Sequence, residues 1–202
     1  FHAPKLGDLQ LIDMLQATLT DKYTGEGMGM TAEKLADIYN ISREEQDEFA
    51  IISHERAAAA RDAGRFAEEI VGVSVKTRKG DVVIDRDEHI KEGSTMESLG
   101  KLRPAFKKNG TVTAANASGI NDGAASVVVA SEAYVKEQSL KPIAKIVSWG
   151  VAGVDPTIMG IGPVPAIKQA LQKADLTLAD MDLVEVNEAF AAQYLAVEKE
   201  LD

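Results

Sequence analysis

The order of apolar segments in residues 127–200 restricts the fold more than any other feature. Short apolar stretches over 127–130, 143–153 and 183–186 alternate with segments of helical periodicity that end near residues 138, 174 and 200. An alternation of strand and helix along the chain is typical of layered α/β domains, in which each element buries one face against the next layer. We therefore predict an α/β fold.

The first half of the chain follows a different pattern. It holds most of the charged side chains and is predicted to be mainly helical. Apolar residues at helical spacing predict helices over 9–19 and 31–39, with Thr31 as the N-cap of the second helix. Because the charge density drops at a polar, turn-like stretch near residue 110, we predict one domain over 1–110 and another over 111–202.

Two capping boxes predict the starts of further helices in the first domain. In such a box, the first side chain and the side chain three residues later each satisfy a backbone N–H that the helix leaves free. Ser42 pairs in this way with Glu45, and Ser94 with Glu97. The helix that begins after Ser42 is expected to stop at Gly64.

A β-hairpin is predicted between these two helices. Residues 70–75 and 81–84 are apolar and rich in β-branched side chains, which is typical of strands. The segment Arg78-Lys79-Gly80 between them supplies a tight turn.

The composition excludes several classes of protein. No cysteine is present, so the chain holds no disulfide, no zinc site built on thiolates and no thiolate nucleophile. The histidines His2, His54 and His89 fit no metal-binding spacing, and we expect the last two to be solvated surface residues. A net charge of −10 disfavours nucleic-acid binding, and no apolar run reaches the ~18 residues of a membrane span.

Two segments carry residues suited to ligand binding. Residues 116–125 combine small residues with turn formers, so their amides are suited either to bind a carbonyl or anion or to form a tight structural turn. Asn187 is expected where a strand ends and a helix begins, the place at which ligands gather in open α/β sheets. Its side chain is suited either to an oxyanion site or to ordinary helix capping.

Seven motifs occur in a fixed order along nearly the whole chain. They are Met28-Gly29-Met30-Thr31-Ala32-Glu33, Ser42-Arg43-Glu44-Glu45-Gln46-Asp47, Lys101-Leu102-Arg103-Pro104-Ala105-Phe106, Asn116 to Ala124, Val154-Asp155-Pro156, Met159-Gly160 with Gly162-Pro163, and Asn187-Glu188-Ala189-Phe190-Ala191-Ala192-Gln193. One of them alone is a weak signal, but the ordered set is specific. With these motifs the chain resembles the thiolase family, and within it the acetyl-CoA acetyltransferase type.

The resemblance implies a layered α/β/α fold with an inserted loop domain of helices and a β-hairpin. Residues 1–110 would be this loop domain, which covers CoA and takes part in oligomer assembly. Residues 111–202 would be part of the core, from the end of its N-terminal half to the start of its C-terminal half. The implied activity is acyl-CoA C-acyltransfer, in which two acetyl-CoA condense to acetoacetyl-CoA and CoA, or the reverse thiolysis.

The resemblance also implies catalytic groups that this sequence does not contain. Thiolases use a cysteine nucleophile, a histidine that activates it, and a second cysteine that moves a proton. The sequence has no cysteine, and none of its histidines lies in the family's glycine-rich histidine motif. We therefore expect this chain to correspond to about the middle half of a thiolase and to be inactive alone.

Site residues follow from the resemblance by motif position. Asn187 would hold the water of an oxyanion hole, Ser118 would hydrogen-bond a pantetheine amide, and Phe190 would wall the acyl pocket. Lys91 and Ser98 would approach the nucleotide end of CoA. The remaining positions of the pantetheine channel would be Leu19, Met28, Phe106, Ala114 and Met159.

The expected partners are acyl-CoA substrates and further copies of the chain, as a dimer or tetramer in the intact enzyme. No cofactor, metal, nucleic acid or membrane partner is expected, since CoA is a substrate. A cytoplasmic location is expected, with the mitochondrial matrix as the alternative. A longer-chain 3-ketoacyl-CoA thiolase and a non-catalytic CoA-binding module remain alternative functions. Gly27, where many acetyl-type members have histidine, leaves the acyl preference open.

Overall fold

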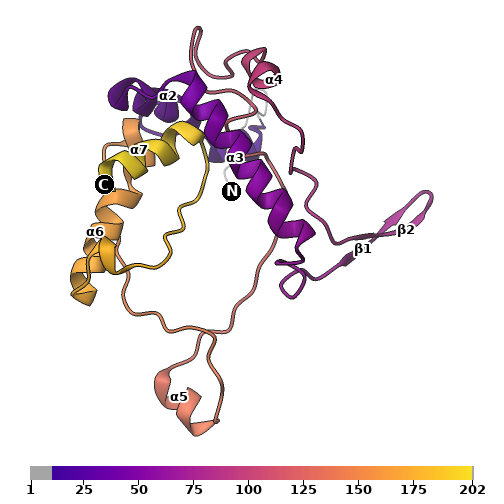
Figure 1. The fold of residues 1–202 in the computed structure, drawn as a ribbon, viewed down its shortest axis with the longest axis vertical. Coiled ribbons are helices and arrows are strands. Elements are labelled where there is room, and N and C mark those ends of the chain that lie inside the picture. Colours follow the sequence, from indigo (N-terminus) through magenta and orange to yellow (C-terminus); the bar gives the residue numbers. More distant parts are fainter. Residues whose placement is uncertain (1–10, 202) are drawn as a thin grey trace, which may run out of the picture.

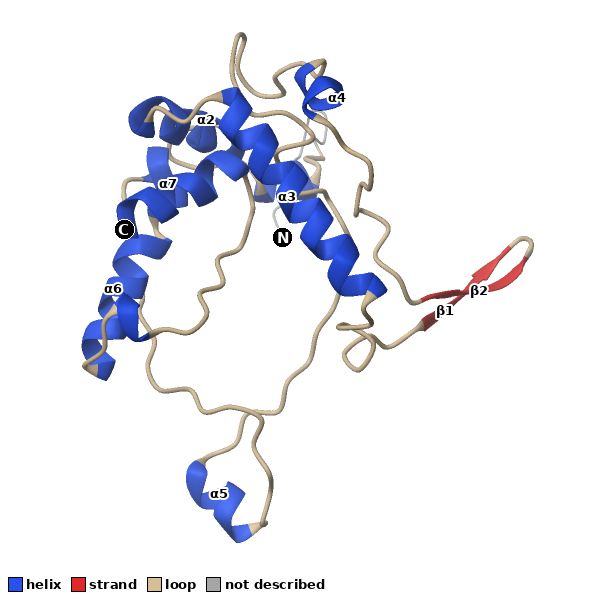
Figure 2. Cartoon of the chain, in the orientation of Figure 1, coloured by secondary structure: helices blue, strands red, loops and turns tan. Residues whose placement is uncertain are grey.

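The computed structural model describes residues 11–201, and its elements are mostly helices joined by long loops (Figures 1 and 2). In chain order they are α1 Met14–Thr18, α2 Met28–Tyr39, α3 Arg43–Asp62, β1 Val73–Thr77, β2 Gly80–Ile84, α4 Met96–Gly100, α5 Glu132–Glu137, the 3₁₀ helix η1 Pro156–Ile161, α6 Pro163–Ala174, the 3₁₀ helix η2 Leu178–Asp180, and α7 Ala191–Leu201. None of the helices in this range combines the length and the apolar character that crossing a bilayer demands.

The hydrophobic core lies where α2, α7 and η1 meet. Its fully buried members are small or branched aliphatic side chains: Ala32, Leu35, Ala36, Ile41, Val112, Ala192 and Ala196. Alanines make up most of the contact between α2 and α7, so these two helices can approach closely. Residues from the first and the last third of the chain therefore share one core, which fixes α7 against α2.

Helix α3 runs beside this core and begins as the sequence predicts. The Ser42–Glu45 capping box is formed on both sides, and Gly64 follows the helix with a φ of 69°. Phe49 stacks on Tyr194 of α7 at 4.4 Å between ring centroids. The aromatic contact attaches the first half of α3 to α7, so α3 is fixed beside the core.

The predicted hairpin is also confirmed. Strands β1 and β2 pair antiparallel, with Val73 opposite Ile84 and Thr77 opposite Gly80. The hairpin projects away from the helices, and all of its residues are exposed (Figure 1). Its register follows from the tight turn at residues 78–79, because two strands joined by so short a loop have only one way to align.

Three predicted strands do not form in the described residues. The segments 127–130, 143–153 and 183–186 are extended and mostly exposed, and Val128 keeps 95% of its surface accessible. A strand is stabilised by hydrogen bonds to a neighbouring strand, and residues 11–201 pair strands only in the β1–β2 hairpin. The alternating pattern was correct for the helices α5 and α6, which need no partner strand.

Several predicted helix ends were wrong by a few residues. Helix α2 begins at Met28, so Thr31 lies inside it, where its hydroxyl donates to the carbonyl of Met28. The second capping box uses Thr95 with Ser98 instead of Ser94 with Glu97. The helix over 9–19 is present only as α1, and residues 1–10 lie outside the described range.

A buried carboxylate joins α2 to the segment that follows residue 110. Glu33 is only 1% exposed, and its oxygens accept from the backbone amide of Thr111 at 2.9 Å and from that of Val112 at 3.0 Å. The Thr111 hydroxyl donates to the same carboxylate at 3.2 Å. Since a buried charge is stable only when its oxygens are hydrogen-bonded, Glu33 fixes the path of this segment.

A second buried carboxylate continues the network on α3. Asp47 accepts from Arg43 Nε at 2.7 Å and from the side-chain amide of Asn116 at 2.8 Å. The Asn116 oxygen in turn accepts from the backbone amide of Thr113 at 2.7 Å. Together with Glu33, these contacts fasten residues 111–116 to both α2 and α3.

We predict that Gly110→Ala lowers the free energy of unfolding by about 1–3 kcal/mol. A Cβ on Gly110 would overlap the Glu33 carboxylate, which its three hydrogen bonds hold in place. Urea unfolding followed by circular dichroism measures the change. Gly100→Ala is the control, because a Cβ there meets open space at the end of α4. Equal losses of unfolding free energy in the two variants would contradict the close packing of Gly110 against the Glu33 carboxylate.

Candidate functional site

The site begins at the start of α2. A β-bridge between Thr20 and Gly27 closes the loop before the helix, and the amide of Met28 donates to the carbonyl of Leu19 at 2.9 Å. This hydrogen bond makes Leu19 and Met28 direct neighbours, although nine positions separate them in the sequence. Both side chains keep part of their surface accessible, so they are available to contact a ligand.

The ring of Phe106 lies directly on this end of α2. A Cβ on Gly29 would overlap the ring, so glycine is required for this close approach. On its other side, Phe106 meets Phe190 in an edge-to-face arrangement, with 5.9 Å between ring centroids and 81° between ring planes. Phe106 therefore connects the start of α2 to the segment before α7, and it remains 44% exposed.

Short β-like pairing joins the Ser118 segment to the Phe190 segment. Ala117 forms an antiparallel bridge with Phe190, and the Ser118 amide donates to the carbonyl of Ala189 at 2.9 Å. The amide of Ala191 donates to the carbonyl of Asn116, also at 2.9 Å. The Ser118 backbone N–H is thus used internally, whereas its exposed side chain is available to a ligand.

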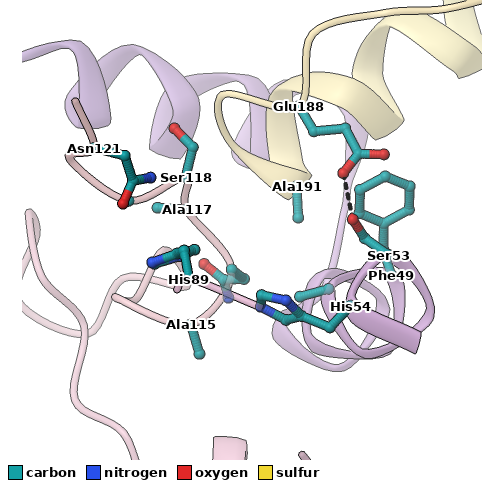
Figure 3. Close-up of a pocket in the computed structure, with 13 residues that line it drawn as sticks. Phe49, Ser53, His54, His89, Ala115, Ala117, Ser118, Asn121, Glu188 and Ala191 are labelled. Atoms are coloured by element: carbon teal, nitrogen blue, oxygen red, sulfur yellow. Dashed lines mark hydrogen bonds between the residues drawn. The ribbon is translucent and has the colours of Figure 1, made fainter. Parts of the chain in front are cut away.

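A hollow of about 200 Å³ lies beside this pairing, between α3 and the loops that carry Ser118 and Glu188. Phe49 and four alanines give it an apolar wall, and its polar lining consists of Ser53, His54, His89, Asn116, Ser118, Asn121 and Glu188. Figure 3 shows the Ser53 hydroxyl bonded to the Glu188 carboxylate, at 2.5 Å. This bond attaches the residue after Asn187 to α3.

The electrostatics of the hollow centre on His54. Burial lowers the pKa of His54 below its ordinary value, and electrostatic interactions with His89 and Lys91 lower it further. The Glu188 carboxylate acts in the opposite direction but does not reverse the shift. A neutral imidazole is therefore favoured in the folded chain. The expectation that His54 and His89 are solvated surface residues was wrong, since both are partly buried in the lining.

The ten residues carried over from the resemblance fall into two groups. A chain of contacts, with Gly29 and Ala117 as intermediates, connects five of them: Leu19, Met28, Phe106, Phe190 and Ser118. Within residues 11–201, the structure shows no direct contact that joins the other five to this chain of contacts: exposed Asn187 and Ala114, Met159 in η1, Lys91 in the loop before α4, and Ser98 in the Thr95 capping box.

Asn187 is not a helix cap, contrary to one of its two interpretations. Helix α7 begins at Ala191, so Asn187 precedes it by four residues in an extended loop. The side chain of Asn187 is exposed, and its neighbour Glu188 is held by Ser53. The second interpretation, that Asn187 belongs to an oxyanion site, stays a prediction.

Sequence reasoning missed Ser53, His54 and Glu188 as members of the site. Ser53 and His54 stand on an unremarkable stretch of α3, and no spacing in the sequence pairs them with residues 89–91 or 188. Their contacts form because the loop of Lys91 and the loop of Glu188 both fold back onto α3. The only signal in the sequence for His54 was the scarcity of histidine, with three in 202 residues.

Comparison with known proteins places these features in a family. The family described as "Thiolase, N-terminal domain" matches residues 2–133, and "Thiolase, C-terminal domain" matches residues 140–202. The chain therefore belongs to the thiolase family.

Its relatives carry two kinds of name. An acetyl-CoA acetyltransferase of Rhizobium meliloti (strain 1021) is 57% identical over 198 residues, covering 98% of this chain and 50% of the relative. The mitochondrial 3-ketoacyl-CoA thiolase of Homo sapiens is 56% identical over 199 residues, with the same coverage. The chain thus spans about half the length of the curated relatives it matches.

Solved structures agree with this assignment. The crystal structure of Bacillus anthracis acetyl-CoA acetyltransferase has a TM-score of 0.93 at 52% identity, covering 98% of this chain and 50% of that chain. Human mitochondrial 3-ketoacyl-CoA thiolase in complex with CoA has a TM-score of 0.90 at 53% identity, covering 100% of this chain and 50% of that one. The thiolase-like α/β fold class predicted from the sequence is confirmed. The domain division at residue 110 stays a prediction.

We predict that the Phe106 and Phe190 rings stabilise each other by about 0.5–1.5 kcal/mol beyond their separate burial, as edge-to-face pairs do. A double-mutant cycle with Phe106→Leu and Phe190→Leu, followed by urea unfolding, measures this coupling. The control cycle combines Phe190→Leu with Tyr23→Leu, because Tyr23 is 91% exposed. Strict additivity in both cycles would argue against the aromatic contact.

Proposed function

We propose that this chain forms the CoA-binding side of an acyl-CoA C-acyltransferase. The reaction is condensation of two acetyl-CoA to acetoacetyl-CoA and CoA, or the reverse thiolysis. The observation that carries the proposal is the chain of contacts that brings the segments of Leu19, Met28, Phe106, Phe190 and Ser118 together. A thin, mostly apolar chain with amide groups, such as pantetheine, suits such a surface.

Each part of the surface has a distinct role in the proposal. The Ser118 hydroxyl bonds a pantetheine amide, while Leu19, Met28, Phe106, Ala114 and Met159 line the channel. Lys91 and Ser98 meet the nucleotide end, where the exposed ammonium of Lys91 acts as a point charge toward a phosphate. Phe190 walls the acyl group, and Asn187 holds a water at the oxyanion. CoA is a substrate, and no separate cofactor is proposed.

Acyl transfer also needs a nucleophile that these residues lack. A thiolate is the reactive form of cysteine, and the sequence contains no cysteine. The proposed catalytic thiolates therefore come from outside these 202 residues, and so does the activating histidine, because no histidine here lies in the family's glycine-rich histidine motif. We propose that the active protein is a homo-oligomer, either a dimer or a tetramer.

A longer-chain 3-ketoacyl-CoA thiolase is the second candidate. Its support is the 56% identity to the human mitochondrial 3-ketoacyl-CoA thiolase, which nearly equals that of the first relative. Steady-state kcat/KM for acetoacetyl-CoA against a longer 3-ketoacyl-CoA, measured on the natural gene product that carries these residues, separates the two.

We predict that this chain binds CoA with a Kd of about 1 mM or tighter, which corresponds to about −4 kcal/mol. Ser118→Ala should weaken binding about 2–12-fold, because one neutral hydrogen bond contributes about 0.5–1.5 kcal/mol. Isothermal titration calorimetry with CoA measures both, and dephospho-CoA probes the Lys91 end.

Ser126→Ala is the matched control, since Ser126 is exposed in the same loop but lies outside the lining of the hollow. It should leave the Kd unchanged. A folded chain that gives no binding heat with CoA would contradict the proposed role of this surface.

A further inference from the structure

His54 anchors the loop that carries Lys91. The imidazole projects from α3, and its Nδ1 accepts a hydrogen bond from the backbone amide of Lys91 at 3.3 Å. The loop before α4 is otherwise exposed over residues 85–88 and 91–93. An acceptor on the rigid helix therefore fixes the position of Lys91, which lies at the proposed nucleotide end.

His89 connects the same loop to the segment of Ser118. Its ring lies 6.0 Å from the His54 ring, measured between centroids, and both rings face the hollow beside α3 (Figure 3). A Cβ on Gly119 would lie only 2.6 Å from His89 Nδ1. The imidazole therefore packs against the backbone directly after Ser118, at a position where only glycine leaves room for it.

Three charged or titratable groups from other elements face His54. His89 and Lys91 come from the loop before α4, and Glu188 comes from the loop before α7. Burial and electrostatic interactions with His89 and Lys91 lower the pKa of His54. Its neutral form, with Nδ1 unprotonated, is the form that accepts from the Lys91 amide.

We infer that His54 and His89 are positioning residues that hold the loops of Lys91 and Ser118 in place for a CoA-type ligand, and that this holds while His54 is neutral. The inference rests on the proposed function, because Lys91 and Ser118 are the proposed ligand contacts. Neither histidine needs to touch the ligand. The pair acts by holding the Lys91 loop to α3 and the segment after Ser118 to the Lys91 loop.

Protonation of His54 breaks the anchor. A proton on Nδ1 replaces the acceptor with a donor that faces the Lys91 N–H, and it adds positive charge beside His89 and Lys91. Because the pKa of His54 is lowered on folding, its stabilising contribution is complete above its unfolded value of about 6.5. The contribution is lost as the pH falls from there through the folded pKa.

The test compares two substitutions at one position. His54→Asn keeps an acceptor oxygen close to the place of Nδ1 but does not titrate, whereas His54→Leu removes the acceptor and keeps an apolar side chain. Hydrogen–deuterium exchange, resolved at the Lys91 amide by electron-transfer fragmentation, measures the anchor. CoA titration calorimetry at pH 7.5 and 5.5 measures its effect on the ligand.

We predict that His54→Leu speeds exchange at the Lys91 amide and weakens CoA binding by about 2–12-fold at pH 7.5. The unaltered chain should move toward the same losses as the pH falls from 7.5 to 5.5, after correction for the intrinsic pH dependence of exchange. His54→Asn should resemble the unaltered chain at pH 7.5 and change little at pH 5.5. This rescue distinguishes the anchor from a general loss of packing.

The outcomes separate the inference from the proposed function. Equal exchange at the Lys91 amide in the unaltered chain and His54→Leu overturns the anchor, whatever CoA does. If His54→Asn and His54→Leu lose the same amount, the acceptor is irrelevant and the inference fails. If the Lys91 amide responds as predicted but CoA gives no heat at either pH, the anchor stands and the CoA-binding proposal fails.

Discussion

The hydrogen bonds of the buried Glu33 carboxylate are the interaction on which the rest of the structure depends. Two backbone amides and one hydroxyl of residues 111–112 point at it from a part of the chain 78 residues away. The carboxylate is completely enclosed, so these donors replace the water that it loses on folding. With Asp47 on α3 and its partner Asn116, Glu33 converts two separate helices and a loop into one unit.

The site inherits its geometry from this unit. Once Asn116 is fixed, its carbonyl accepts from Ala191 and the next residues pair with Ala189 and Phe190. The pairing sets Phe190 against Phe106, which itself rests on the glycine at the start of α2. The backbone at Gly119, directly after Ser118, packs against His89, whose ring lies 6.0 Å from the His54 ring of α3.

Local features were predictable from the sequence, and distant ones were not. The Ser42 capping box and the β1–β2 hairpin were correct because their partners lie within a few residues of each other. The strand over 127–130 was wrong because pairing depends on other strands, which no local pattern supplies. In the site, motif resemblance predicted Phe106, Ser118 and Phe190. The surroundings of His54 were not predictable, because they depend on how the loops of Lys91 and Glu188 fold back onto α3.

The free energy of unfolding of Glu33→Gln, measured by urea denaturation, tests this account most directly. Glutamine has the same shape but sets an N–H₂ group against the amides of Thr111 and Val112. The account predicts a loss of about 2 kcal/mol or more, since hydrogen bonds to a charged group contribute about 1.5–3 kcal/mol each. Glu137→Gln on the exposed α5 is the control. A Glu33→Gln chain as stable as that control would contradict the central role of the carboxylate.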